Sequence, residues 1–479
     1  MPTATLNETN QSNTLAYSPA LRPMTEWAQG ATIYQIFLRA FTPEGTLRAA
    51  EKLLDHLADL GVNIVYLCPV VESDDDMDRD GWSPRQKDSG VNNPKNPYRQ
   101  KDYYTIDPEY GTDGDLLSFV KRAHELGLKV ILDLVYLHCG PTAVFIEEHP
   151  DFVKHHEDGS ILTNAWNFPI LNFEGQGLRE YLWRNMEYFI EKFDVDGYRC
   201  DVSNKVPLDF WVEGRRRIEA LKPDLFMLAE SAPPSIAEQE FAFDVSYGFR
   251  YTYLLNDVLE KNVPVSELRE LLENFCEESM GARLLRAFDN HDICNDHKEL
   301  RQEVICTPEA IHAAMVLGFS LDGMPFLYNG QEVADGNRHT LWSNRMHGNN
   351  HGIDWSNALT PKGKARMELV KSLIALRKKE AVLSEGSTQW LDNTTPEGVL
   401  SFIRTLDGER VLVIFNLSGG LLSTTIDATL ELSGAKPLAQ FGMELRQDGD
   451  ALIVESKAYG YLLMKLQVLP NLVGLKSAT

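Results

Sequence analysis

Arg199 and Asp201 are two residues whose types and spacing could carry out chemistry. The segment 195–200 is predicted to be a short buried strand, and side chains two positions apart on a strand point to the same side. A guanidinium beside a carboxylate favours the ionised form of that carboxylate, which suits a nucleophile. A structural ion pair at a strand end would show the same pattern, so the choice depends on what the other strands carry.

Other predicted strands end in side chains of the same kinds. Asp133 lies near the end of one strand and His138 follows it, Glu230 follows the next strand but one, and His291 with Asp292 follows another. Each alone has an ordinary interpretation as a structural carboxylate, a helix cap or a turn residue, and we assign Asp133 a structural role. Carboxylates from three strands on one rim, together with histidines and an arginine, would instead form a site for acid–base and nucleophilic catalysis.

The elements that must position these residues alternate regularly along the chain. Short apolar segments are followed by stretches with apolar residues at helical spacing, which is typical of parallel strands joined by helices. Eight such strands favour a closed (β/α)8 TIM barrel of the α/β class, in which functional side chains lie at the carboxyl ends of the strands. The predicted strands are 33–38, 62–67, 128–135, 195–200, 225–229, 241–245, 283–288 and 324–328.

Changes in composition and period predict the domain organisation. Residues 1–24 are polar and are expected to form a mobile N-terminal arm. The catalytic barrel is expected over 25–138 and 177–381, with a small subdomain, 139–176, inserted after the third strand. Residues 382–479 contain short strands separated by Asp-Gly and Gly-Gly turns, which predicts a C-terminal antiparallel β-sandwich domain.

The overall composition limits the class of partner. The 479 residues include 70 Asp and Glu against 46 Lys and Arg, and the resulting net charge of −24 repels phosphate backbones, so we expect no nucleic-acid partner. A neutral polyhydroxylated substrate is not repelled. The N-terminus lacks a signal-peptide pattern and no apolar run could span a membrane, so we expect no membrane partner and a cytoplasmic location. The six scattered cysteines are interpreted as reduced packing residues.

Four motifs occur in order along the predicted barrel. They are Asp133-Leu-Val-Tyr-Leu-His138, Gly197-Tyr-Arg-Cys-Asp201, Glu230 and Phe288-Asp-Asn-His-Asp292. Together they resemble the signature regions of the α-amylase family of retaining glycoside hydrolases, and the chain is most similar to members that act on α-glucans inside the cell. The segments 96–104 and 323–332 support the resemblance, and the β domain fits the family's C-terminal domain.

The resemblance implies three catalytic carboxyl groups. Asp201 would be the nucleophile that attacks the anomeric carbon, and Glu230 would protonate the leaving oxygen and then activate water. Asp292 would hold ring hydroxyls and favour the distorted sugar of the transition state. In a retaining enzyme the carboxyl groups of Asp201 and Glu230 are expected about 5–5.5 Å apart.

The resemblance also implies a set of substrate-binding residues. Arg199 would keep Asp201 ionised, and Tyr98 would stack on the apolar face of the sugar at which the bond is cleaved. The two histidines would hydrogen-bond sugar hydroxyls, and Arg338 would be a further basic contact after the eighth strand. The expected substrate-binding residues are therefore Tyr98, His138, Arg199, His291 and Arg338.

The sequence departs from the family pattern at two places. Many members have an asparagine that helps to bind a structural calcium ion where this chain has Leu137, which offers no oxygen ligand, so we predict that this site is missing and that no metal or other cofactor is used. The acidic loop 71–80 is an alternative cation site, although a solvated loop is the preferred interpretation. Asn204 and Lys205 follow the nucleophile in place of a usual Lys-His pair, which affects the preference for the acceptor.

The sequence therefore predicts retaining hydrolysis of α-glucosidic bonds, chiefly α-1,4, in malto-oligosaccharides or related α-glucans. Transglycosylation between α-glucans and α-glucosidase action use the same site and stay open as alternatives, as does the oligomeric state. A hypothesis from another class is a non-catalytic sugar-binding protein on the same scaffold. The presence of all three carboxyl groups together with Arg199 argues against it.

Overall fold

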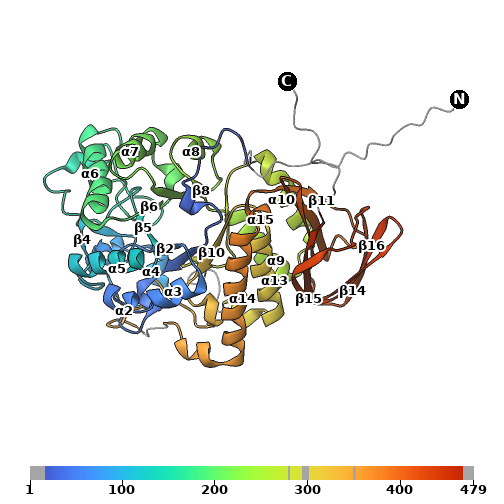
Figure 1. Ribbon diagram of the computed structural model, residues 1–479. Helices are drawn as coiled ribbons and strands as arrows, with labels where there is room; N and C mark the ends of the chain where they lie inside the picture. The colour runs from blue at the N-terminus through green and yellow to red at the C-terminus, as the bar shows by residue number, and fades with distance from the viewer. Residues whose placement is uncertain (1–16, 279–280, 294–300, 349–351, 468–479) are drawn as a thin grey trace, which may run out of the picture.

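A closed barrel of eight parallel strands forms the larger part of the molecule (Figure 1). The computed structural model describes residues 17–278, 281–293, 301–348 and 352–467, without the side chains of 275–278. The barrel strands are β1 (Ile33–Ile36), β2 (Ile64–Leu67), β5 (Lys129–Leu134), β6 (Gly197–Cys200), β7 (Phe226–Ala229), β8 (Val245–Ser246), β9 (Leu285–Arg286) and β10 (Met324–Tyr328). Their order is β8-β7-β6-β5-β2-β1-β10-β9, which confirms the predicted (β/α)8 fold.

The barrel closes between its two shortest strands. A parallel bridge joins Ser246 to Leu284, and the Ser246 amide donates to the Arg283 carbonyl at 2.9 Å. The predicted strand over 241–245 is only partly correct, because helix α8 (Ile236–Phe241) takes up its beginning and leaves a two-residue strand.

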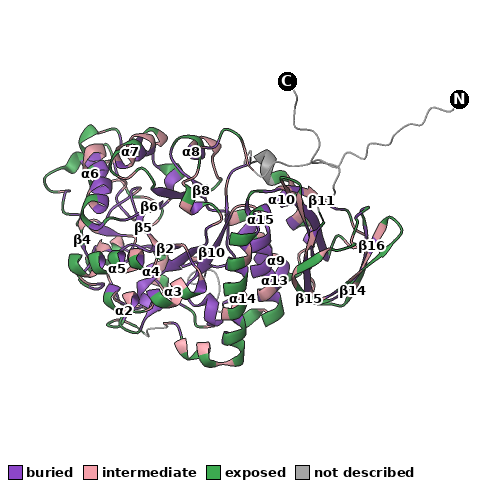
Figure 2. Ribbon diagram, viewed as in Figure 1, coloured by how far each residue is buried: buried purple, intermediate pink, exposed green. Residues whose placement is uncertain are grey.

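Apolar side chains alternate between the barrel interior and the surrounding helices. Ile33, Ile64 and Ile131 belong to the cluster inside the barrel, whereas their neighbours Tyr34 and Val65 belong to the cluster under the helices. This alternation follows from the two-residue period of a strand. Both faces are covered, so every residue of the barrel strands except Lys129, at the start of β5, is buried (Figure 2).

Helices surround the barrel and several begin at side-chain caps. The predicted capping box of Thr112 and Asp115 opens α5, and Pro308 stands in the first turn of α13, where a missing amide hydrogen does no harm. The helices are α1 (Leu38–Phe41), α2 (Leu47–Glu51), α3 (Leu54–Leu60), α4 (Pro84–Asp88), α5 (Asp113–Glu125), α6 (Gln176–Phe193), α7 (Leu208–Leu221), α9 (Phe249–Lys261), α10 (Val265–Glu278), α12 (Gln302–Ile305), α13 (Pro308–Ser320), α14 (Pro361–Lys379) and α15 (Ala381–Glu385).

Two insertions follow the second and third barrel strands. In the first, β3 (Val71–Ser73) pairs antiparallel with β4 (Gln100–Ile106), and the loop between them carries α4. The second extends from His138 to the start of α6 and is held by isolated antiparallel bridges, among them His138 to Ile170 and Val153 to Leu171. Both insertions supply residues to one pocket at the carboxyl ends of the strands.

The C-terminal domain is an antiparallel sheet that folds over its own core. Its strands are β11 (Ser387–Trp390), β12 (Val399–Leu406), β13 (Glu409–Asn416), β14 (Leu422–Asp427), β15 (Lys436–Asp448) and β16 (Ala451–Leu466). One half of β16 pairs with β13 and the other half with β14. Tyr459 has a φ of +54° where β16 bends between them. Ile414 from one layer and Val454 from the other share one apolar cluster, as in a sandwich.

Residues 17–24, the described part of the N-terminal segment, contact the rest of the molecule and do not form the predicted mobile arm. The Tyr17 hydroxyl donates to the Ser384 carbonyl at 2.9 Å and accepts from the Gly323 amide at 2.8 Å, and Leu21 is buried. The hydrogen bonds of Tyr17 and the burial of Leu21 attach this segment to the rest of the molecule. Residues 1–16 lie outside the described part. None of the helices in the described ranges is long and apolar enough to cross a membrane.

Candidate active site

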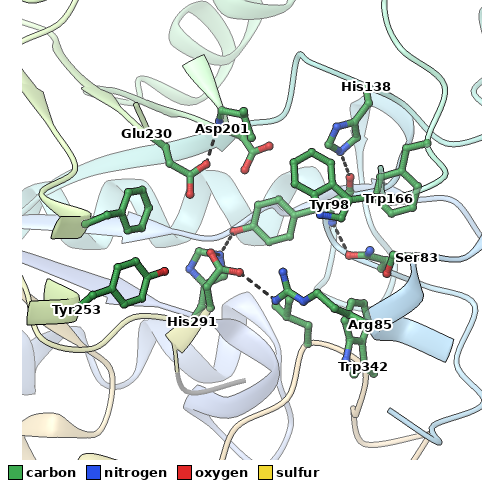
Figure 3. A pocket seen from close by; sticks show the side chains of 16 residues that line it. Ser83, Arg85, Tyr98, His138, Trp166, Asp201, Glu230, Tyr253, His291 and Trp342 are labelled. Carbon is green, nitrogen blue, oxygen red and sulfur yellow. Dashed lines mark hydrogen bonds and ion pairs between the residues drawn. The ribbon is translucent and has the colours of Figure 1, made fainter. Parts of the chain in front are cut away.

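A pocket of about 250 Å³ lies at the carboxyl ends of the barrel strands (Figure 3). This volume is slightly below the usual range for ligand sites, which is about 300–1,000 Å³. Six of the eight residues that the sequence assigned to the site line it: Tyr98, His138, Asp201, Glu230, His291 and Asp292.

Arg199 lies behind the pocket and joins its carboxyl groups. Its Nη1 is 2.7 Å from Asp133 and 2.8 Å from Asp201, and its Nη2 is 2.8 Å from Glu230. The arrangement follows from the register, because Arg199 on β6 is level with Asp133 on β5, and Glu230 directly follows β7. Two carboxyl groups on neighbouring nitrogens of one planar guanidinium must face the same small volume.

The carboxyl group of Asp201 is buried and lies close to other charged groups. Its burial and the neighbouring Glu230 carboxylate raise the pKa of Asp201 well above its usual range, and Arg199 acts in the opposite direction. The direction of this shift is opposite to the expectation that Arg199 keeps Asp201 ionised.

The turn after Asp201 directs a backbone amide at Glu230. Val202 has a φ of +43°, and its amide donates to Glu230 Oε2 at 2.9 Å. A β-branched residue rarely adopts a positive φ, so the turn stores backbone strain next to the paired carboxyl groups. The amide fixes one oxygen of Glu230, while Arg199 contacts the other.

Asp133 accepts hydrogen bonds from the surrounding side chains. The hydroxyls of Tyr66 and Tyr98 donate to its Oδ2 at 2.6 and 2.9 Å, and Arg199 donates to its Oδ1 at 2.7 Å. These partners hold Asp133 inside the wall, which agrees with the structural role we assigned to it. Asp133 thereby anchors both Tyr98 and Arg199.

His291 continues this network. Its Nδ1 lies 2.7 Å from Gln35 Nε2, which can only donate, so the ring proton is assigned to Nε2, 2.7 Å from the Tyr98 hydroxyl. Burial lowers the pKa of His291 and keeps the ring neutral. The ring of His291 also stacks on that of Tyr98, with centroids 5.2 Å apart.

His138 also lines the pocket, but its two ring nitrogens bind the protein. Nε2 donates to the Tyr98 carbonyl at 2.8 Å, and Nδ1 accepts from the Asn164 amide at 3.1 Å. Burial lowers the pKa of His138 to about 4. The expected hydrogen bond to a sugar hydroxyl is therefore not available from either nitrogen in this arrangement, and His138 instead ties the backbone of Tyr98 to the inserted subdomain.

The α-amylase catalytic domain family model matches residues 3–158 and 160–359, well over half of the chain. The chain belongs to the α-amylase family of glycoside hydrolases. The described pocket lies at the end of the barrel formed by the carboxyl termini of the strands, which is where TIM-barrel enzymes carry their active sites.

Relatives within the family are moderately similar over most of the chain. An intracellular maltogenic amylase of Bacillus subtilis (strain 168) is 25% identical, over 90% of this chain and 77% of the relative. A cyclomaltodextrinase of Geobacillus thermopakistaniensis is 26% identical, over 88% and 70%. The crystal structure of a maltogenic α-amylase from Thermotoga neapolitana superposes with a TM-score of 0.75 at 25% identity, over 92% of this chain and 99% of that one.

Arg338 does not join the site, contrary to the prediction. Its side chain is exposed and does not line the pocket, whereas the next residue, His339, is buried and contacts Tyr328 and Asp335. The buried imidazole anchors this loop, so the adjacent Arg338 faces solvent.

Sequence reasoning missed a second arginine and several aromatic residues of the pocket. Arg85 lines the pocket and contacts Asp292 with Nη2 to Oδ1 at 3.4 Å. Nothing in the residue types of its loop distinguishes Arg85 from the nearby Lys87, which lies outside the pocket. The missed aromatic residues are Trp166, Phe168, Phe249, Tyr253 and Trp342.

The acidic loop 71–80 is matched by basic side chains and a hydroxyl. Buried Asp74 lies 3.2 Å from Arg99 and accepts from the Thr142 hydroxyl at 2.8 Å, and Asp75 lies 2.8 Å from Lys101. Among the described residues, no group of three or more His, Cys, Asp or Glu side chains could hold a metal ion. The missing calcium site stays a prediction.

Proposed function

We propose that the chain hydrolyses α-glucosidic bonds, chiefly α-1,4, in malto-oligosaccharides or related α-glucans with retention of configuration. The observation that carries the proposal is the contact of one buried guanidinium, that of Arg199, with both Asp201 and Glu230 at 2.8 Å. Two carboxyl groups that face one small pocket are what a retaining glycosidase requires.

The reaction would proceed in two displacements. Asp201 attacks the anomeric carbon while Glu230 gives its proton to the leaving glycosidic oxygen, which leaves a glycosyl ester on Asp201. Glu230, now a carboxylate, then takes a proton from water as the water oxygen attacks the same carbon, and the ester bond to Asp201 breaks. Each step inverts the anomeric carbon, so the product keeps the configuration of the substrate.

The neighbouring residues would bind the sugar that is transferred. Asp292 would accept hydrogen bonds from ring hydroxyls, and Tyr98 would present its ring, held by Asp133 and His291, to the sugar face. The substrate class is supported by the names of the relatives, a maltogenic amylase and a cyclomaltodextrinase. Hydrolysis and transfer to another sugar share the glycosyl ester and differ in the group that attacks it.

We also propose that the chain acts inside the cell and needs no cofactor. One relative is named an intracellular amylase, and Cys68, Cys139 and Cys200 are buried free thiols, as is usual in a reducing compartment. No step of the reaction above requires a metal ion.

The test combines stereochemistry with product analysis. Proton NMR of freshly mixed enzyme and an aryl maltoside should show the α-anomer of the sugar first, because retention follows from the glycosyl ester. Chromatography of an early maltoheptaose digest should show shorter products only, whereas oligomers longer than the substrate would assign the chain to transfer. A β-anomer appearing first, or an unchanged rate for Asp201→Asn, would overturn the proposal.

A further inference from the structure

Arg85 projects across the pocket from the first insertion. It lies on α4, and its guanidinium contacts Asp292 at 3.4 Å (Figure 3). The side chain of Arg85 is 38% exposed, so it forms part of the pocket wall while its outer edge meets solvent.

Hydrogen bonds hold the part of the pocket wall that carries Arg85 in place. The Ser83 hydroxyl caps α4 by accepting from the Gln86 amide at 3.1 Å. The buried Gln86 side chain donates to the Asn93 carbonyl at 2.8 Å, and the Asn93 side chain donates to the Trp342 carbonyl at 2.9 Å. This chain of hydrogen bonds connects the helix of Arg85 to the loop of Trp342, another lining residue, so both belong to one wall.

The position of this wall relative to the catalytic carboxyl groups decides which part of a sugar it meets. Arg85 and Trp342 lie on the side of the pocket away from Glu230 and Asp201 (Figure 3). In a pyranose ring C4 lies opposite C1. A sugar whose C1 faces Asp201, with its leaving oxygen at Glu230, therefore turns its C4 hydroxyl toward the wall that holds Arg85.

We propose that Arg85, held against Asp292, closes the pocket at C4, so that the enzyme accepts only the glucosyl unit at the non-reducing end and releases one glucose per cleavage. The inference rests on the proposed function and narrows the substrate of that function to the non-reducing end of an α-glucan chain. A chain that continued beyond C4 would need the space of the guanidinium. A terminal hydroxyl instead meets the donors of Arg85 and the acceptor oxygens of Asp292. The pocket volume of about 250 Å³ agrees with so short an occupant.

The test compares substrates with and without chain ends. The wild-type enzyme, Arg85→Ala, Arg85→Lys and the control Lys87→Ala would be given maltoheptaose labelled at its reducing end, β-cyclodextrin and an aryl α-glucoside. Lys87 lies on the same helix, outside the pocket, so its loss should change nothing. The wild type should release glucose and labelled maltohexaose first and leave the cyclodextrin uncut. Arg85→Ala should raise the share of maltose and longer products, and the cyclodextrin rate, by about tenfold or more.

Three outcomes separate the claims. Wild-type enzyme that first releases maltose, or that opens β-cyclodextrin as fast as it cuts maltoheptaose, overturns the role of Arg85 and leaves retaining hydrolysis standing. A folded Arg85→Ala variant that keeps the wild-type product pattern overturns the role of Arg85 as well; Arg85→Lys serves where the alanine variant fails to fold. Wild-type enzyme that cleaves none of the three substrates overturns the proposed function itself.

Discussion

The Nη2 atom of Arg199 lies 2.8 Å from Oε1 of Glu230, although the two residues come from different strands. The same guanidinium binds Asp201 and Asp133 with Nη1, so three carboxyl groups depend on one cation. Burial alone would favour an uncharged arginine, but these neighbours raise the pKa of Arg199 and keep it charged.

Replacing Arg199 by lysine should therefore reduce both activity and stability. A compact ammonium group cannot contact three carboxyl groups in one plane, so we expect kcat/KM on an aryl maltoside to fall by about 10²–10³-fold. The free energy of unfolding in urea should fall by about 3–5 kcal/mol, the usual cost of breaking a buried ion pair. Arg216→Lys, on an exposed helix surface, is the matched control. Activity within a few-fold of wild type would contradict the role given to Arg199.

Asp201→Asn should remove activity and increase stability near neutral pH. Because the pKa of Asp201 is raised in the folded state, its contribution to stability is full below the usual carboxyl pKa and is lost as pH rises through the folded pKa. An amide has no proton to lose in this range. The variant should gain Tm relative to wild type as pH rises, on the order of 2–4 °C. Thermal unfolding at a series of pH values measures this, with exposed Asp209→Asn as control, and a lower Tm at neutral pH would contradict it.

His138 should make the fold sensitive to acid. Its folded-state pKa is lowered from 6.5 to about 4 by burial, so its contribution is present above pH 6.5 and is lost as pH falls toward 4. His138→Gln should reduce the slope of unfolding free energy against pH in this window. The same change at exposed His156 should leave the slope as it is in wild type. Equal slopes for both variants would show that His138 is not buried in its neutral form.

Tyr253 is expected to bind the part of the substrate that leaves. It lies on α9 at the Glu230 side of the pocket, 45% exposed, with its ring stacked on Phe249 (Figure 3). Tyr253→Ala should raise KM for maltoheptaose by about tenfold and change kcat little, because the lost stacking is equal in ground and transition states. Phe441→Ala, an exposed aromatic of the C-terminal domain, is the control. A fall in kcat at constant KM would instead place Tyr253 in the chemical step.

Removal of calcium should leave the protein unchanged. Leu137 offers no oxygen ligand where many family members have asparagine, and Asp74 already lies against Arg99. We expect the same Tm and the same rate before and after dialysis against EDTA. A drop in Tm that added calcium restores would reveal a cation site that the sequence did not predict.

The barrel and the location of its site could be predicted because they follow from short-range patterns. Strands show apolar runs, and the residues that end them reach the pocket whatever the loops do. Asp201 and Glu230 directly follow their strands and line the pocket for that reason, whereas Asp292 reaches it from the loop after β9. The motifs place them along the chain, and the parallel order of the strands brings them together in space.

Loop contacts could not be predicted because they depend on distant partners. Arg85 and Arg338 are both basic residues in long loops, yet only the first enters the pocket, since its helix is anchored through Gln86. The bonds of His138 depend on Asn164 in the inserted subdomain, whose path has no short-range signal. Tyr17 is held by hydrogen bonds with Ser384 and Gly323, which are distant in the sequence, rather than by its polar sequence neighbours.

The central claim is that Asp201 forms an ester with the sugar while Glu230 acts as the general acid and base. Trapping that ester tests the claim most directly. A fluorinated α-glucosyl fluoride, which forms the ester quickly and releases it slowly, would be mixed with the enzyme, and the digested protein would be analysed by mass spectrometry. The account predicts one added fluoroglucosyl group, on the peptide that contains Asp201, in an enzyme inactivated with time. A group attached to any other residue, or an inactive enzyme without one, would contradict it.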